Sequence, residues 1–105
     1  MKPIVLFVAA AAVSLSGAAA LAADAPQLLK DKACFACHIV DKKLVGPSYK
    51  EVAAKYKSRK DAEAYLVKKI KEGSTGVWGP VPMPPNATVA DSDAKTLAKY
   101  ILTIK

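Results

Sequence analysis

The two cysteines and the single histidine of the 105-residue chain fall within five consecutive positions, Cys34, Phe35, Ala36, Cys37 and His38. Cysteines three residues apart bring their sulfur atoms to the same side of a helical turn. Three chemistries use this spacing: a redox dithiol, a metal site, and covalent attachment of haem, for which Cys-x-x-Cys-His is the signature. A thioredoxin-like dithiol needs a strand before the helix, and a closed zinc site needs four ligands.

Haem attachment explains all three side chains. Each thiol can add to one vinyl group of the haem, and the adjacent imidazole then reaches the iron. An electron-transfer haem of this type commonly takes methionine as its second axial ligand. Met83 is the one methionine besides Met1. We therefore predict one covalently bound haem c, anchored by Cys34 and Cys37 and ligated by His38 and Met83. The alternative for Met83 is a methionine that only fills the core. The alternatives for Cys34, Cys37 and His38 are a haem-free dithiol or a metal site.

The N-terminus has the three parts of an export signal. Lys2 gives a basic start, residues 4–15 form an apolar run, and residues 20–22 read Ala-Leu-Ala. This pattern predicts a cleaved signal peptide over residues 1–22 and a periplasmic domain over residues 23–105. A retained membrane anchor is the alternative, because about 20 apolar residues can span a bilayer.

Removing residues 1–22 from the 105 leaves 83, with 15 basic and 9 acidic side chains, because only Lys2 is lost. A domain this short buries only about 60–65% of its unfolded surface, so it needs a staple such as a cofactor. The lysines are scattered and Arg59 is the single arginine, which argues against nucleic-acid binding. A basic surface of this kind suits acidic protein partners, or simply solubility.

The hydrophobic pattern predicts one all-α domain and no strand. Ser48 and Glu51 have capping-box spacing, and apolar residues follow at helical intervals. Proline and glycine interrupt the stretch between Gly73 and Val89, which we predict to be a functional loop. The predicted helices begin at Asp24, at Ser48, at Ser58 or Asp61, and between Asp91 and Asp93, with inner positions Leu28, Leu29, Tyr49, Val52, Ala53, Tyr56, Ala62, Tyr65, Leu66, Ile70, Leu97, Ala98, Ile101 and Ile104.

Several separated stretches together resemble the short monohaem class I cytochromes c of bacterial respiratory chains, the type that donates electrons to nitrite reductase in denitrifiers. The matching stretches are DKACFACH, KKLVGPSYKEVAAKY, GVWGPVPMPPN and DAKTLAKYIL. The resemblance implies four to five helices around the haem, with the first and last helices crossing.

The resemblance also implies roles around the haem for three residues. Pro47 matches the proline whose carbonyl accepts the Nδ1 proton of the ligating histidine, His38. Asn86 matches the residue whose amide approaches the methionine sulfur. Trp78 matches the indole that donates to a haem propionate. As alternatives, Pro47 and Asn86 are turn residues and Trp78 is a core side chain.

Four positions depart from the pattern of these relatives. Lys69 stands where an arginine often pairs with a propionate, so that contact is expected to weaken. Leu29 and Tyr100 replace a frequent phenylalanine and tryptophan, and should pack the crossing helices differently. Ala33 replaces a frequent glycine, from which we predict that this turn does not require positive φ.

The resemblance implies a soluble, monomeric one-electron carrier that is not an enzyme. Its expected partners are acidic-surfaced redox proteins: a membrane cytochrome bc complex as donor, and a haem nitrite reductase or a terminal oxidase as acceptor. They would dock at the haem edge near lysines such as Lys30, Lys32, Lys42 and Lys43. After signal cleavage no stable membrane insertion is expected. The rival class is an enzyme or sensor in which Met83 leaves the iron and a small ligand binds.

Overall fold

The computed structural model describes residues 3–4 and 24–105, and all regular structure in these residues is helical. The predicted signal peptide over residues 1–22 lies outside the described residues apart from Pro3 and Ile4, so it stays a prediction. In chain order the elements are α1 (Ala25–Asp31), the 3-10 turn η2 (Cys34–Ala36), α2 (Tyr49–Tyr56), α3 (Ala62–Glu72) and α4 (Asp91–Leu102). The predicted all-α class is confirmed.

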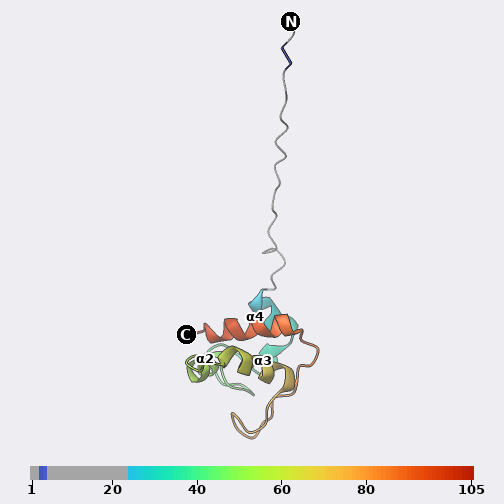
Figure 1. Ribbon diagram of the computed structural model, residues 1–105. Helices are drawn as coiled ribbons and strands as arrows, with labels where there is room; N and C mark the ends of the chain where they lie inside the picture. The colour runs from blue at the N-terminus through green and yellow to red at the C-terminus, as the bar shows by residue number, and fades with distance from the viewer. Residues whose placement is uncertain (1–2, 5–23) are drawn as a thin grey trace.

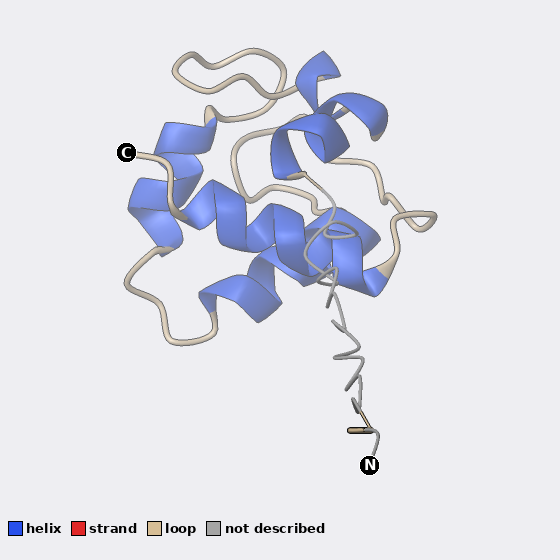
Figure 2. Ribbon diagram, turned by 90° about the horizontal axis from the view of Figure 1, so that it is seen from above, coloured by secondary structure: helices blue, strands red, loops and turns tan. Residues whose placement is uncertain are grey.

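The C-terminal helix α4 organises the domain. It packs against α1, α2 and α3, and it lies across α2 and α3 in Figure 1. Figure 2 shows the same helices from above, joined by long loops. The contact between the first and last helices is as predicted, with Leu29 at 2% and Leu97 at 1% exposure. One core therefore joins α4 to the other three helices, and its buried members are Leu28, Leu29, Tyr49, Val52, Tyr56, Ala62, Leu66, Ile70, Val89, Ala94, Leu97, Ala98 and Ile101.

A capping box explains where α2 begins, and a glycine marks where α3 ends. Ser48 Oγ accepts from the Glu51 amide at 3.1 Å, and Glu51 Oε2 accepts from the Ser48 amide at 3.3 Å, which confirms the predicted capping box. Asp61 precedes α3 but makes no capping bond. Its carboxylate pairs instead with the guanidinium of Arg59, at 3.1 Å between Nη2 and Oδ2. Gly73 ends α3 at φ 74°, as its position after the helix predicts.

The prediction for Ala33 is wrong. Its φ of 58° and ψ of 26° place it in the left-handed region. It follows Lys32, the residue that caps the C-terminal end of α1, and therefore occupies the position where helices commonly end on a left-handed residue, usually glycine. The chain must turn sharply here because α1 stops at Asp31 and η2 begins three residues later, at Cys34. The geometry of the turn thus overrides the preference of alanine.

Within the described part of the chain, no helix is both long and apolar enough to cross a membrane. The four α-helices range from 7 residues in α1 to 12 in α4.

Candidate functional site

A cleft opens between η2, α2, α3 and the loop that joins α3 to α4. Its empty space is about 920 Å³, part of it open to solvent, and all eight residues predicted for the site either line it or contact a residue that does. Apolar side chains dominate the lining, with a few polar groups among them. This size and character are typical of cofactor and ligand sites.

Cys34 and Cys37 form one wall of the cleft. The 3-10 turn brings them together, since the Cys37 amide donates to the Cys34 carbonyl at 3.2 Å. Burial raises the pKa of the Cys34 thiol. A reactive dithiol needs a lowered pKa, so this environment suits an anchor better than a redox pair.

His38 is held in one orientation at the same wall. Its Nδ1 lies 2.8 Å from the carbonyl oxygen of Pro47, which is buried. A carbonyl only accepts, so Nδ1 carries the proton and the lone pair of Nε2 is free to bind a metal. A Cβ added at Gly46 would lie 2.5 Å from Cε1 of His38. The ring can therefore occupy this place only because residue 46 is glycine.

Tyr49 closes the wall behind the histidine. Its ring stacks on the imidazole of His38 with 5.4 Å between centroids and 30° between planes, and Phe35 meets its edge at 6.3 Å. Tyr49 is 3% exposed, yet its hydroxyl has no hydrogen-bond partner among the described residues. A buried hydroxyl almost always has a partner, so this atom indicates that a further group belongs in the cleft.

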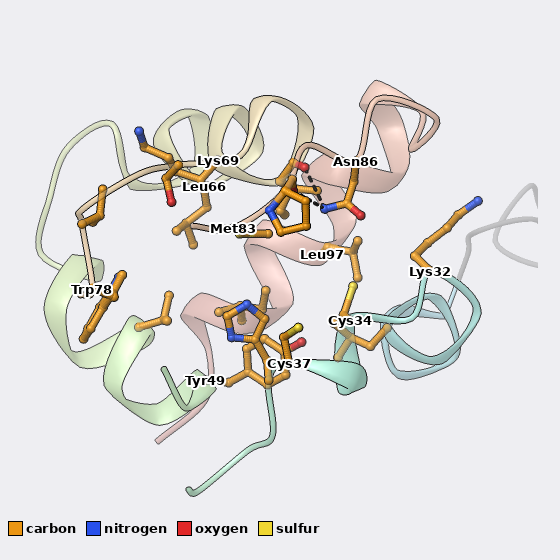
Figure 3. A pocket seen from close by; sticks show the side chains of 18 of the residues that line it. Lys32, Cys34, Cys37, Tyr49, Leu66, Lys69, Trp78, Met83, Asn86 and Leu97 are labelled. Carbon is orange, nitrogen blue, oxygen red and sulfur yellow. Dashed lines mark hydrogen bonds between the residues drawn. The ribbon is translucent and has the colours of Figure 1, made fainter. Parts of the chain in front are cut away.

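Met83 lies on the other side of the cleft from Cys37 and Tyr49 (Figure 3). Its backbone is fixed by two hydrogen bonds with Ser74, at 2.9 Å from the Met83 amide and 3.1 Å to the Met83 carbonyl. Gly73 makes this pairing possible, because a Cβ there would collide with the Met83 carbonyl and lie 2.9 Å from the nitrogen of Pro85. The bridge to Ser74 thus fixes the backbone position of Met83 within the loop.

Asn86 ties the end of this loop to α3. Its backbone amide and its side-chain Nδ2 both donate to the carbonyl of Ile70, at 3.0 and 3.1 Å. Nδ2 also lies 3.5 Å from the carbonyl of Pro84, as the dashed lines in Figure 3 show. The approach of this amide to the Met83 sulfur stays a prediction, and the observed bonds show how Asn86 fixes the loop.

Trp78 and Lys69 line the far end of the cleft, where aromatic rings and cations gather. The ring of Tyr56 meets Trp78 edge-on at 6.2 Å and lies 4.9 Å from Tyr65. Burial, together with the neighbouring Tyr65 hydroxyl, raises the pKa of Tyr56 to about 12. The ammonium of Lys69 lies 5.1 Å from the Tyr65 ring. Its predicted contact with a propionate stays a prediction.

Three residues important to the site were not identified from the sequence. Gly46 occurs in the matching stretches, but nothing in its type predicts an approach to His38. Tyr49 follows the helical apolar pattern, which indicates burial and not a stack on the imidazole. Ser74 carries no sequence signal at all, because its bridge to Met83 depends on the path of the loop.

The zinc alternative gains no support. Among the described residues, no three His, Cys, Asp or Glu side chains are placed to hold a metal ion together. A haem fits better: two thiols and an imidazole with a free Nε2 occupy one wall, a thioether lies opposite, and apolar side chains lie between them. The fold and site together define a small all-α protein built around a covalently attached haem.

Comparison with known proteins agrees with a small all-α haem protein. The cytochrome c family profile matches residues 22–105. The chain is 52% identical to cytochrome c-551 of Pseudomonas aeruginosa, over the full length of both. It is 54% identical to cytochrome c-552 of Nitrosomonas europaea over 92% of this chain and 91% of the relative. A crystal structure of the Nitrosomonas europaea cytochrome c552 superposes with a TM-score of 0.74 and 56% identity, covering 76% of this chain and 99% of the other.

This chain therefore belongs to the cytochrome c family. It is a small monohaem class I cytochrome with a covalently attached haem c, and its relatives are electron carriers.

Proposed function

We propose that this protein is a periplasmic one-electron carrier in which His38 and Met83 are the two axial ligands of the haem iron, and Cys34 and Cys37 form the two thioethers. The observation that carries the proposal is that the pre-oriented imidazole of His38 stacks on Tyr49, and that the loop-fixed Met83 lies across the cleft from Tyr49. The bound haem supplies an iron that alternates between the ferrous and ferric states.

The protein's own residues keep both ligands in place. Pro47 fixes the tautomer of His38 and raises its basicity as a ligand through the hydrogen bond to Nδ1. Ser74 and Asn86 hold the loop on either side of Met83 through backbone hydrogen bonds. A site that does not rearrange when the charge changes favours rapid electron transfer over binding of substrates, so we propose that the protein is not an enzyme.

Apolar side chains limit the access of water to the site. Leu66, Ile70, Leu97 and Ile101 line the cleft, and all four are buried. A dry, low-dielectric lining influences the reduction potential of a haem. In this proposal, Trp78 and Lys69 interact with the propionates at the far end of the cleft.

The proposed partners are acidic redox proteins: a membrane cytochrome bc complex as donor, and a haem nitrite reductase or a terminal oxidase as acceptor. Lys32 lines the cleft, and Lys30, Lys42 and Lys43 are exposed. Such a basic surface accelerates encounter with acidic proteins and makes the rate fall with salt. We propose a monomer that docks transiently.

Intact mass of the exported protein tests the cofactor and the processing together. We expect a chain that begins at Ala23 or Asp24 plus one haem that survives denaturation. A mass without haem would overturn the proposal, and haem on a chain that keeps residues 1–22 would overturn the cleavage part alone.

Exposure of the reduced protein to carbon monoxide separates a carrier from a sensor. With Met83 on the iron, the wild-type spectrum stays unchanged, whereas the spectrum of Met83→Ala shifts because the iron is open. Immediate binding by the wild type would favour the sensor class.

A further inference from the structure

Trp78 lies on a loop that gives its ring little support from regular structure. It belongs to the stretch between the Ser74 and Met83 bridge partners, where Gly76 and Gly79 both adopt positive φ. The indole is only partly buried and meets the ring of Tyr56 edge-on at 6.2 Å. Its orientation must therefore depend on side-chain contacts.

Lys55 makes such a contact from the last turn of α2. Its ammonium lies 4.4 Å from the centroid of the Trp78 ring and 5.5 Å from that of Tyr56. Both distances fall within the range of a cation–π interaction, and tryptophan is the strongest aromatic partner. The side chain of Lys55 thus reaches across from α2 to the loop.

The other cations of this region contact a different ring. The guanidinium carbon of Arg59 lies 4.0 Å from the Tyr65 centroid, and the ammonium of Lys69 lies 5.1 Å from it. Among the described residues, Lys55 alone provides a cation–π contact to Trp78. Arg59 and Lys69 thus contact Tyr65, whereas Lys55 contacts Trp78 and Tyr56.

We propose that Lys55 is a positioning residue that fixes the indole of Trp78 at the end of the haem cleft. The proposal rests on the proposed function, in which Trp78 donates its single N–H to a propionate. Orientation of the ring decides where that N–H points, because the indole has no other polar atom. Loss of the cation would let the ring sample other rotamers and admit water beside the propionates.

Lys55→Met in the loaded, mature protein is the central variant, because methionine keeps an apolar stem over the ring and removes the charge. Lys55→Arg restores a cation. Lys50→Met is the matched control, since Lys50 is exposed on the same helix and lacks an aromatic contact among those observed in the described residues. Trp78 is the single tryptophan, so its indole N–H gives one NMR signal in a ¹⁵N-labelled sample.

Hydrogen exchange of that indole N–H should accelerate about two- to fivefold in Lys55→Met, the population change that one exposed cation–π contact supplies. It should stay at the wild-type rate in Lys55→Arg and Lys50→Met. The reduction potential should fall in both methionine variants, because each loses a positive charge, and should fall further in Lys55→Met.

Equal exchange rates in Lys55→Met and Lys50→Met would overturn the proposal. Faster exchange with equal potentials in the two variants would also overturn it, because the indole's position would then have no bearing on the haem. Failure of the proposed function would appear separately, as wild-type protein without haem or with an iron that lacks its second axial ligand.

Discussion

Nδ1 of His38 lies 2.8 Å from the carbonyl oxygen of Pro47, and the backbone between them passes so close to the imidazole that residue 46 has no room for a side chain. The hydrogen bond and the close approach act together. One sets which nitrogen carries the proton, and the other sets where the ring lies. The orientation of the proposed proximal ligand therefore follows from two consecutive residues of one loop, Gly46 and Pro47.

Gly46→Ala should displace this ring. A Cβ at position 46 would lie 2.5 Å from Cε1 and 2.9 Å from Nδ1 of His38, so the imidazole must move and its bond to Pro47 must lengthen. We expect a loss of about 1–3 kcal/mol in the free energy of unfolding, measured with denaturant, and a changed haem absorption spectrum.

Gly76→Ala is the control, because a Cβ there meets no neighbour although φ is 72°. That variant should lose stability through its backbone alone and keep the wild-type spectrum. An unchanged spectrum in Gly46→Ala would show that the close approach does not orient the ligand.

Ala33→Gly should stabilise the protein. Alanine at φ 58° carries a steric cost of about 1–2 kcal/mol, and glycine removes it while adding freedom to the unfolded chain. The expected net gain is about 0.5–1 kcal/mol, seen as a higher denaturant midpoint at the same slope. A lower midpoint would mean that the steric cost of Ala33 in the folded state is smaller than the free energy by which the added freedom of glycine stabilises the unfolded chain.

Tyr49→Phe tests whether the cleft supplies a partner for the buried hydroxyl. The phenyl ring keeps the stack on His38, so only the hydroxyl is removed. If the filled cleft satisfies this group, the loaded variant should lose about 1 kcal/mol of stability in thermal or denaturant unfolding. A variant as stable as the wild type, or more stable, would show that the hydroxyl stays unpaired.

Tyr56 should make the protein sensitive to alkaline pH. Its pKa is raised to about 12 in the folded state, mainly by burial, so the folded state binds its proton more tightly than the unfolded chain does. That stabilisation is complete below about pH 10, the usual tyrosine pKa, and is lost as pH rises through about 12. Tyr56→Phe should therefore lose less stability than the wild type between these values in denaturant titrations.

Tyr100→Phe is the matched control for this titration, because Tyr100 lies outside the lining of the cleft. Parallel curves for the wild type and Tyr56→Phe would contradict the assignment of the alkaline transition to Tyr56.

Patterns with a local cause were predictable from the sequence. The capping box at Ser48 and the buried stripes of α3 and α4 follow from spacing alone, because a helix repeats its geometry at every turn. The candidate haem ligands were also predictable, because the Cys-x-x-Cys-His motif and the single methionine after the predicted signal peptide can be recognised from residue type and count alone.

Features that depend on the path of a loop were not predictable. The pairing of Ser74 with Met83 and the contact of Lys55 with Trp78 join residues from different segments, and no periodicity marks them. For Ala33 the sequence led to a wrong prediction. Its type argues against positive φ, but the connection between α1 and the cysteines imposes it.

The central claim, that His38 and Met83 both bind the iron, is tested most directly by the visible absorption of the ferric protein at neutral pH. A methionine–iron bond gives a weak band near the red end of the spectrum. We predict that the wild type shows this band with low-spin haem and that Met83→Ala loses it. High-spin haem in the wild type, or a band that persists in Met83→Ala, would contradict the account.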